Sequence, residues 1–276
     1  MLRVRVAVVL LLSVCLLPPV TAGQTTTYRI LVINDDGVRA PGLAAVAQIL
    51  QAIGDVTIVA PADNQSGRGH AITIAEPMFR QEVTLPNGLR AIGVTATPAS
   101  TMKVALHAIV KPPPDLVVSG INRGYNLGLS AYVSGTVGAA REAAMAGIPA
   151  IAASTTGTVG DYGFAAEEVL GVARRVKQYG LPRHSFLNVN IPSPRPEPYK
   201  GYLVTAQAMT PGGDERFVED THPSGRTFYW NLFTEGGTAP EGTDVWAVAN
   251  GYVSVTPMQV GEEAAAVREA LRGWFK

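Results

Sequence analysis

Two adjacent aspartates, with an asparagine before them and a glycine after them, are the most informative residues of this chain. Asn34, Asp35, Asp36 and Gly37 directly follow an apolar run at 30–33. A short apolar run bounded by turn residues indicates a buried strand, and ligands of α/β proteins bind beyond the carboxyl ends of such strands. Two adjacent carboxylates repel each other unless a hard cation such as Mg²⁺ or Mn²⁺ neutralises them. The pattern therefore points to a divalent-metal site.

The same residues also suit a plain turn, because Asn and Asp tolerate left-handed backbone angles and hydrogen-bond to their own backbone. Short motifs taken alone give many false positives. A metal site and a turn that caps a helix are therefore both open interpretations of these four residues, and other segments have to decide between them.

Strands and helices alternate along most of the chain, as the spacing of apolar residues predicts. We expect strands at 30–33, 56–60, 116–119, 149–153, 186–189 and 253–256, and helices at 42–53, 102–110, 136–146, 164–179 and 262–274. This alternation predicts an α/β fold with a Rossmann-like, doubly wound and mostly parallel sheet. From Pro192 onward Pro, Gly and Thr are frequent and aromatic residues cluster at 228–230, which predicts a hairpin or irregular arm.

Three further polar segments are expected at the same edge of the sheet as the aspartates. Two follow predicted strands, at 63–70 and 119–128, and one precedes a predicted helix, at 134–136. Parallel strands end at a common edge, so these segments should meet there. Glycine lets a ligand approach the backbone closely, while Ser and Asn supply neutral oxygen ligands or hydrogen-bond donors.

The third segment, Ser134, Gly135 and Thr136, suits the N-terminus of a helix. Free N–H groups and the helix dipole favour a phosphate group at such a place. Taken alone, plain N-capping by Ser134 is the simpler interpretation, and His70 alone suggests a local hydrogen-bonding residue. The chain has neither a dinucleotide fingerprint nor a Walker loop, which argues against nucleoside-triphosphate chemistry.

The first 22 residues have the pattern of a secretory signal peptide. Arg3 and Arg5 precede an apolar stretch at 7–17, and a small-residue cleavage site ends at Ala22. The apolar stretch is too short for a stop-transfer helix. The single cysteine, Cys15, lies in this leader, so the mature chain would contain no disulfide and no catalytic thiol. We therefore expect an exported protein, periplasmic or secreted, in which 23–276 form a single domain with a core at about 28–191 and an extension at about 192–276.

The charge of the chain gives no support to nucleic-acid or membrane-surface binding. It contains 22 Lys and Arg residues against 22 Asp and Glu residues, so its formal net charge is +0. Binding to a nucleic-acid duplex or to anionic lipid usually requires a basic excess. We expect neither kind of partner, and no membrane association after cleavage of the leader.

In combination, these segments resemble the SurE family of survival-protein phosphatases. The shared motifs lie at 33–37, 40–42, 59–61, 64–67, 118–122, 126–128 and 132–137, with further matches at 187–192, 242–244 and 251–257. The resemblance follows the family order over nearly the whole mature chain. It implies a metal-dependent phosphatase that acts on nucleoside monophosphates, and an extended C-terminal arm used in dimer or tetramer assembly.

The resemblance also implies roles for individual residues. The metal ligands of the family fall on Asp35, Asp36, Ser66 and Asn122, and its phosphate-contacting positions fall on Asn126, Ser134, Gly135 and Thr136. Two carboxylates, a hydroxyl and an amide oxygen form a set of hard oxygen donors, which suits one Mg²⁺ or Mn²⁺ ion per subunit. Of the two aspartates, either could also act as the catalytic base or nucleophile.

The chain departs from the family pattern at two places near the expected site. Ser100 stands where relatives usually carry an acidic residue, and Leu129 and Ser130 also replace acidic residues. We favour a divalent-metal-dependent phosphomonoesterase that hydrolyses nucleoside 5′- and 3′-monophosphates and forms a homodimer or homotetramer. The alternative is an exported protein that binds a metal and an anion with little catalysis.

Overall fold

The computed structural model describes residues 27–158, 160–261, 268 and 271–272. The predicted leader at 1–22 and nearly all of the predicted helix at 262–274 lie outside the described residues, so both remain predictions. Within the described ranges, no helix combines the length and the apolar character that a membrane crossing requires.

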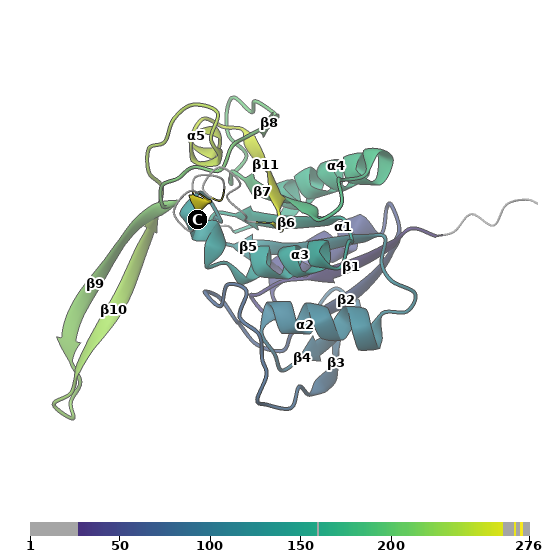
Figure 1. Cartoon of the computed structure of the whole chain (residues 1–276), viewed down its shortest axis with the longest axis horizontal. Helices are drawn as coiled ribbons and strands as arrows, with labels where there is room; N and C mark the ends of the chain where they lie inside the picture. The colour runs from purple at the N-terminus through teal and green to yellow at the C-terminus, as the bar shows by residue number, and fades with distance from the viewer. Residues whose placement is uncertain (1–26, 159, 262–267, 269–270, 273–276) are drawn as a thin grey trace, which may run out of the picture.

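The described residues form a nine-stranded sheet with a parallel centre (Figure 1). In chain order its strands are β1 (Arg29–Ile33), β2 (Asp55–Pro61), β3 (Arg80–Thr84), β4 (Arg90–Val94), β5 (Leu116–Arg123), β6 (Ala150–Thr155), β7 (Ser185–Ile191), β8 (Tyr202–Val204) and β11 (Val253–Gln259). Their spatial order is β3-β4-β2-β1-β5-β6-β7-β11-β8. The run from β4 to β7 is parallel, whereas β3 and β11 pair antiparallel with β4 and β7. The predicted doubly wound, mostly parallel sheet is confirmed.

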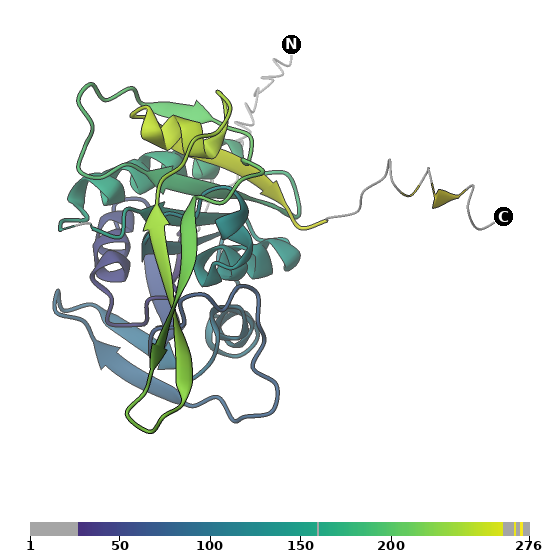
Figure 2. The same ribbon diagram turned by 90° about the vertical axis from the view of Figure 1, so that its left-hand side faces the viewer.

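Helices cover both faces of this sheet, as the side view in Figure 2 shows. They are α1 (Pro41–Leu50), α2 (Pro98–Val104) with a π-helical continuation (Ala105–Ile109), α3 (Gly135–Met145), α4 (Gly163–Tyr179) and the short α5 (Asp244–Ala249). α1 packs beside α4, and α2 packs beside α3. Pro41 and Pro98 stand at the first positions of α1 and α2, where proline presets a helical φ and lacks only an N–H that would be unpaired.

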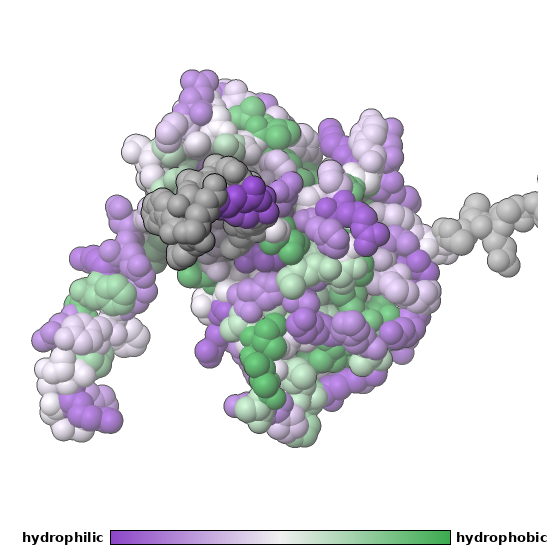
Figure 3. All heavy atoms as spheres, viewed as in Figure 1, coloured by the Kyte–Doolittle hydropathy of each residue, from purple (hydrophilic) through white to green (hydrophobic). Residues whose placement is uncertain are grey.

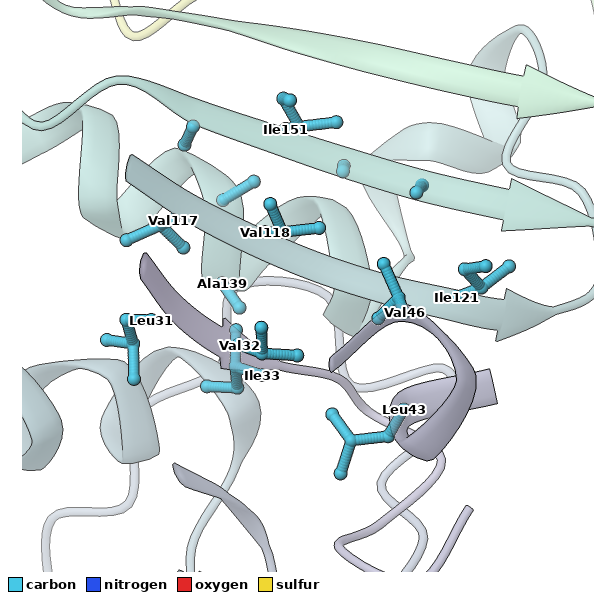
Figure 4. Packing of buried hydrophobic residues seen from close by; sticks show 14 of the residues in the cluster. Leu31, Val32, Ile33, Leu43, Val46, Val117, Val118, Ile121, Ala139 and Ile151 are labelled. Atoms are coloured by element: carbon cyan, nitrogen blue, oxygen red, sulfur yellow. The ribbon is translucent and has the colours of Figure 1, made fainter. Parts of the chain in front are cut away.

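The core lies between the parallel strands and the helices on either side (Figure 4). Val32, Val118 and Ile151 come from three neighbouring strands and are fully buried. A parallel strand covered by helices on both faces is apolar along its whole length, which explains the continuous apolar runs of β1 and β5. This packing fixes the carboxyl ends of the strands, where the polar segments begin.

A long hairpin projects from the body of the molecule (Figures 1 and 2). It consists of β9 (Gly213–Thr221) and β10 (Thr227–Glu235), which pair antiparallel from Thr227 opposite Thr221 to Glu235 opposite Gly213. The predicted hairpin arm after Pro192 is therefore confirmed. Its aromatic side chains, among them Tyr229 and Trp230, are exposed rather than buried in the core.

Three details differ from the prediction. The helix expected at 102–110 already begins at Pro98, while β3, β4, β8 and α5 were not predicted, because each is too short to show a clear apolar period. The strand expected at 116–119 continues to Arg123, so that the segment 119–122, expected in a loop, lies in β5. Gly120 makes this continuation possible. Its φ is +140°, and a Cβ at this position would lie 2.3 Å from the carbonyl oxygen of Ala153, so only glycine fits.

Candidate functional site

The predicted polar segments meet at the carboxyl edge of the sheet. The backbone N–H of Gln65 donates to the carbonyl oxygen of Asp35 at 2.7 Å, which joins the segment after β2 to the end of β1. The N–H of Gly69 donates to the carbonyl oxygen of Val133 at 2.9 Å, which joins the same segment to the start of α3. Ile33, the last residue of β1, pairs with Ser119, so the final residues of β5 follow directly beside the end of β1. The structure thus brings together the segments predicted from the sequence.

Asp35 is buried against the N-terminus of α3. Its Oδ1 accepts a hydrogen bond from the Thr136 hydroxyl at 2.5 Å. A Cβ on Gly135 would lie 2.8 Å from the Cβ of Asp35, so this close approach requires glycine. Burial raises the pKa of Asp35, and the Thr136 hydroxyl with the backbone amides of Gly135 and Thr136 opposes that rise. The start of α3 therefore holds a carboxylate in place.

Asp36 lies next to this carboxylate and is half-buried. Its Oδ2 accepts a hydrogen bond from the backbone N–H of Arg123, the last residue of β5, at 3.0 Å. Burial, with the neighbouring charge of Asp35, raises the pKa of Asp36 to about 6. Two adjacent carboxylates of which one raises the pKa of the other are a favourable place for a cation.

Ser66 and Asn122 flank the aspartates from the segment after β2 and from β5. Ser66 is exposed, and its backbone N–H donates to Asn64 Oδ1 at 2.7 Å, which fixes a tight turn. Asn122 is buried and donates from Nδ2 to the carbonyl oxygen of Gly124 at 2.7 Å. With its Nδ2 engaged, the side-chain oxygen of Asn122 is the atom that can serve as a ligand.

The predicted phosphate-contacting residues begin beside these ligands. Asn126 is buried and donates from Nδ2 to Ser154 Oγ at 2.7 Å, and its backbone is held by Asn188 and Asn190. Ser134 is the N-cap of α3, because its Oγ accepts from the N–H of Val137 at 3.2 Å. The capping role of Ser134 is thus present in the structure, and its contact with phosphate stays a prediction.

Comparison with known proteins decides the family. The model of the family described as "Survival protein SurE" matches residues 30–212. The chain belongs to the SurE family.

Individual relatives of SurE type match over most of their length. The 5′-nucleotidase SurE 1 of Thermus thermophilus is 45% identical over 249 residues, which are 89% of this chain and 97% of the relative. The 5′-nucleotidase SurE of Geobacter sulfurreducens is 43% identical over 254 residues, covering 89% and 93%. The crystal structure of the SurE protein from Aquifex aeolicus superposes with a TM-score of 0.77 at 38% identity and covers 90% of this chain and 100% of that chain. Relatives named as 5′-nucleotidases support the expectation of an enzyme that hydrolyses phosphoric monoesters.

Two carboxylates of the C-terminal third, to which the sequence analysis assigned no role in the site, hold backbone segments of this SurE site. Glu235, at the base of the hairpin, accepts from the N–H of Tyr125 at 2.8 Å and from the N–H of Gly157 at 3.1 Å. Asp244 is fully buried and accepts from the N–H of Gly128 at 2.9 Å. Asp244 falls in a motif shared with the family. No pattern in the sequence around Glu235 marks it as a site residue, because its hydrogen-bond partners lie far away in the sequence.

Ser100, the departure from the SurE pattern, is buried and performs a structural task. Its Oγ accepts from the backbone N–H of Thr73 at 2.7 Å. Ser100 thereby holds the residues that directly follow the segment 63–70, which contains Ser66. His70 lies in that same segment, and its Nε2 is 2.8 Å from Glu142 Oε2 on α3, so it forms a hydrogen bond as predicted, but with a partner that is distant in the sequence rather than local. Lys103 Nζ approaches the other oxygen of Glu142 at 2.6 Å.

We expect Glu142→Gln to destabilise the SurE fold in a pH-dependent way. Burial raises the pKa of Glu142, but the hydrogen bonds and charges of His70 and Lys103 outweigh it and hold the pKa below its ordinary value. A lowered pKa in the folded state adds stability at neutral pH that is lost as the pH falls through that pKa. The variant should lose about 1–3 kcal/mol of unfolding free energy at pH 7, measured by urea denaturation.

The same denaturation repeated at acid pH completes this test. The difference between wild type and Glu142→Gln should shrink as the pH falls below the ordinary carboxyl range of about 4–5. Glu82→Gln is the matched control, since Glu82 pairs with Arg80 on the exposed surface. An unfolding difference that stays constant with pH would contradict the assignment to Glu142.

Proposed function

We propose that this chain is a divalent-metal-dependent phosphomonoesterase that releases phosphate from nucleoside 5′- and 3′-monophosphates. The observation that carries the proposal is the Asp35 carboxylate, buried at the start of α3 next to Asp36, which accepts from the backbone N–H of the residue after Asn122. An acidic pair at the carboxyl edge of a parallel sheet lies where α/β proteins bind their ligands. The relatives named as 5′-nucleotidases support the nucleotide as substrate.

The donor atoms at this edge fit one Mg²⁺ or Mn²⁺ ion per subunit. Asp35 and Asp36 would supply carboxylates, Asn122 an amide oxygen and Ser66 a hydroxyl, which are the hard oxygen ligands that such cations prefer. A positive charge between the aspartates would also relieve the repulsion that raises the pKa of Asp36. Across the part of the chain that the structure describes, no three His, Cys, Asp or Glu side chains form a metal-binding cluster, so the site depends on these two carboxylates and neutral oxygens.

The residues around the phosphoryl group would have different roles in the reaction. A bound divalent cation supplies Lewis-acid polarisation of the phosphoryl group. Asp35 is held rigidly by Thr136, whereas Asp36 keeps Oδ1 for the cation or for a proton of the attacking water. We propose that Asn126, Ser134, Gly135 and Thr136 border the phosphate, because the dipole of α3 favours negative charge at its N-terminus. Such stabilisation matters since uncatalysed hydrolysis of phosphate monoesters is so slow that enzymes accelerate it by up to ~10²¹-fold.

Phosphate release from nucleoside 5′- and 3′-monophosphates, with Mn²⁺, Mg²⁺ or EDTA, tests the proposal. We expect release with at least one of the metals and none with EDTA. If a folded sample releases no phosphate under any condition, yet binds Mn²⁺ and inorganic phosphate in calorimetry, the chain is a binding protein with little catalysis.

Asn122→Ala should weaken metal binding by at least about tenfold, because it removes one oxygen donor and the contact that orients it. The quantity to measure is the dissociation constant of Mn²⁺ by isothermal titration calorimetry. Asn87→Ala is a suitable control, since Asn87 is an exposed turn residue between β3 and β4. Equal affinities for Asn122→Ala and wild type would remove this residue from the proposed ligand set.

We also propose that the leader at 1–22 exports the chain and that the mature protein forms a homodimer or homotetramer. The exposed apolar side chains of the hairpin, such as Phe217 and Trp230, support association with a further copy. N-terminal sequencing of the exported protein should begin at Gly23, and light scattering should give a mass of two or four chains. A full-length N-terminus or a monomeric mass would overturn the respective proposal.

A further inference from the structure

A cavity of about 670 Å³ lies at the carboxyl edge of the sheet, and Gln65 in its lining is hydrogen-bonded to the backbone of Asp35. We call it the β4 cavity, because it is lined by the end of β4 and residues 94–97 and by parts of the segment 62–76 that follows β2. β4, β2 and β1 are adjacent parallel strands, so they all end at this edge. Neighbouring strands are about 4.8 Å apart, which puts the end of β4 ~10 Å from the end of β1. This span matches the reach of a nucleoside beyond its phosphate group.

The wall of the β4 cavity is also part of the proposed metal site. Asp63, Gln65 and Arg68 line the cavity, and Ser66 lies among them in the chain. The hydrogen bond from Gln65 to Asp35, at 2.7 Å, holds this segment against the acidic pair. A ligand that fills the cavity therefore lies next to the groups that would bind its phosphate.

The lining of the β4 cavity combines apolar and hydrogen-bonding groups. Ile72 and Ile74 offer apolar side chains, and Ile74 is 86% exposed, which is unusual for so large an apolar side chain. Figure 3 shows hydrophobic residues gathered over the segment that connects β2 with β3. Arg68 and Thr95 line the same cavity and carry side chains that can donate hydrogen bonds. A flat base with a polar edge and a ribose with hydroxyl groups need this mixture, and pockets of 300–1,000 Å³ are typical for small ligands.

The outer wall of the β4 cavity is tied to Thr97, the N-cap of α2. The Thr97 hydroxyl donates to the carbonyl oxygen of Ala71 at 2.6 Å, and the N–H of Thr97 donates to Thr73 Oγ1 at 3.1 Å. Ser100 adds its contact with the N–H of Thr73. A preformed wall lowers the cost of ordering the chain on binding.

A second cavity near the aspartates, of about 450 Å³, suits a nucleoside less well. It is lined by Arg123 and Tyr162 among others. Tyr162 is only 9% exposed and so offers little ring surface for stacking, while the Arg123 side chain already donates from Nε to the carbonyl oxygen of Gly157. The larger and more mixed β4 cavity is the better fit.

We propose that the β4 cavity binds the ribose and base of the substrate, an inference that rests on the nucleotidase function proposed above. Ala75→Trp would fill the cavity from its exposed wall, and Ile74→Ala would remove an apolar surface. Val204→Ala is the control for the second variant, since Val204 is a 75% exposed β-branched residue on β8, at the far edge of the sheet.

The decisive comparison is between a nucleoside 5′-monophosphate and a small ester, phenyl phosphate, which lacks ribose and base. Ala75→Trp should raise KM for the nucleotide by about tenfold or more, and Ile74→Ala by about threefold, while kcat/KM for phenyl phosphate changes by less than about twofold. Unchanged KM for the nucleotide in Ala75→Trp would overturn the assignment. An equal loss of kcat/KM for both substrates would also overturn the assignment. The cavity wall would then affect the reaction through Ser66 rather than by binding the nucleoside.

Binding of adenosine separates this inference from the proposed function. Calorimetry of the wild-type chain without metal should detect adenosine, and Ala75→Trp should weaken its binding by a similar factor. If the wild type hydrolyses neither ester, the nucleotidase function fails, and weakened adenosine binding would still support the cavity. Adenosine binding that is equal in wild type and Ala75→Trp would refute the cavity whatever the activity.

Independently, the geometry points to Glu235 as a positioning residue of the metal site. Both of its oxygens approach the N–H of Gly157 at 3.1 Å, Oε1 also accepts from Tyr125, and Oε2 accepts from the Thr156 hydroxyl at 3.0 Å. Tyr125 follows Gly124, whose carbonyl oxygen holds the Nδ2 of Asn122. Removal of the carboxylate would release the segment that aims the side-chain oxygen of Asn122.

Glu235→Ala should therefore weaken Mn²⁺ binding by about tenfold in calorimetry, and Glu235→Gln, which keeps one accepting oxygen, should retain part of the affinity. Glu219→Ala, an exposed carboxylate in the middle of β9, should bind Mn²⁺ like the wild type. If Glu235→Ala lowers only the unfolding temperature and leaves the Mn²⁺ affinity unchanged, the role is structural and the inference fails.

Discussion

Asp35→Asn is expected to abolish metal-dependent phosphate release, by at least about 10³-fold in kcat, while the chain stays folded. The substitution keeps the size of the side chain and an oxygen that can accept from the Thr136 hydroxyl. It removes the negative charge that would bind the cation, and it puts an NH₂ group beside the positive end of the α3 dipole. Burial already disfavours the charged form of Asp35, so removing this charge should lower the free energy of unfolding only slightly.

Two measurements test this prediction. Phosphate release from a nucleoside 5′-monophosphate measures the loss of activity, and thermal unfolding shows whether the variant stays folded. Asp55→Asn is the matched control, because Asp55 is an exposed aspartate at the start of β2, at the opposite edge of the sheet from the site. Activity of Asp35→Asn within about threefold of the control would remove Asp35 from the site. Global unfolding of the variant would show that the carboxylate holds the fold rather than a metal.

Gly135→Ala is expected to reduce kcat/KM by about 10²-fold, because it displaces the buried carboxylate by a fraction of an ångström or more. The added Cβ would lie 2.8 Å from the Cβ of Asp35, 2.9 Å from its Oδ2 and 2.9 Å from Cγ of Pro98. These neighbours are packed between β1, α2 and α3 and cannot move aside freely. The same clash should cost about 1–3 kcal/mol of unfolding free energy.

Gly163→Ala provides a closely matched control. Gly163 is the first residue of α4, as Gly135 is of α3, and a Cβ there would meet only the carboxylate of Asp161 at 3.3 Å. Kinetics and urea denaturation of the two variants should differ clearly. If Gly135→Ala keeps the activity and stability of Gly163→Ala, the contact between α3 and Asp35 is looser than the structure indicates.

The sequence predicted the parts of the fold that depend on buried apolar periodicity. β1, β5 and β6 are buried on both faces, so their apolar runs are visible without any knowledge of their neighbours. The polar segments after them could be assigned to one edge, because parallel strands share their carboxyl ends. This is why Asp35, Asp36 and Asn122 could be grouped before the structure was known.

Other features depend on contacts that local sequence does not encode. β5 continues through Ser119, Gly120 and Asn122, which look like a loop, since only the carbonyl oxygen of Ala153 shows why glycine is needed there. β3 is an exposed and largely polar edge strand, and β4 is a strand of only five residues, so hydrophobic periodicity is weak in both. Glu235 contacts Tyr125 across 110 positions of the chain, a separation at which residue type alone carries no information.

The hairpin is attached so that its length can vary without disturbing the body of the protein. Gly213 and Glu235 form its last cross-strand pair, and the N–H of Gly236 closes the base on the carbonyl oxygen of Gly212 at 3.0 Å. Paired antiparallel residues are only about 5 Å apart, so a two-residue turn could bridge the strands just beyond this pair. The hairpin is thus an interchangeable module. A designer, or natural insertion and deletion, could shorten or replace it while Glu235 stays in place.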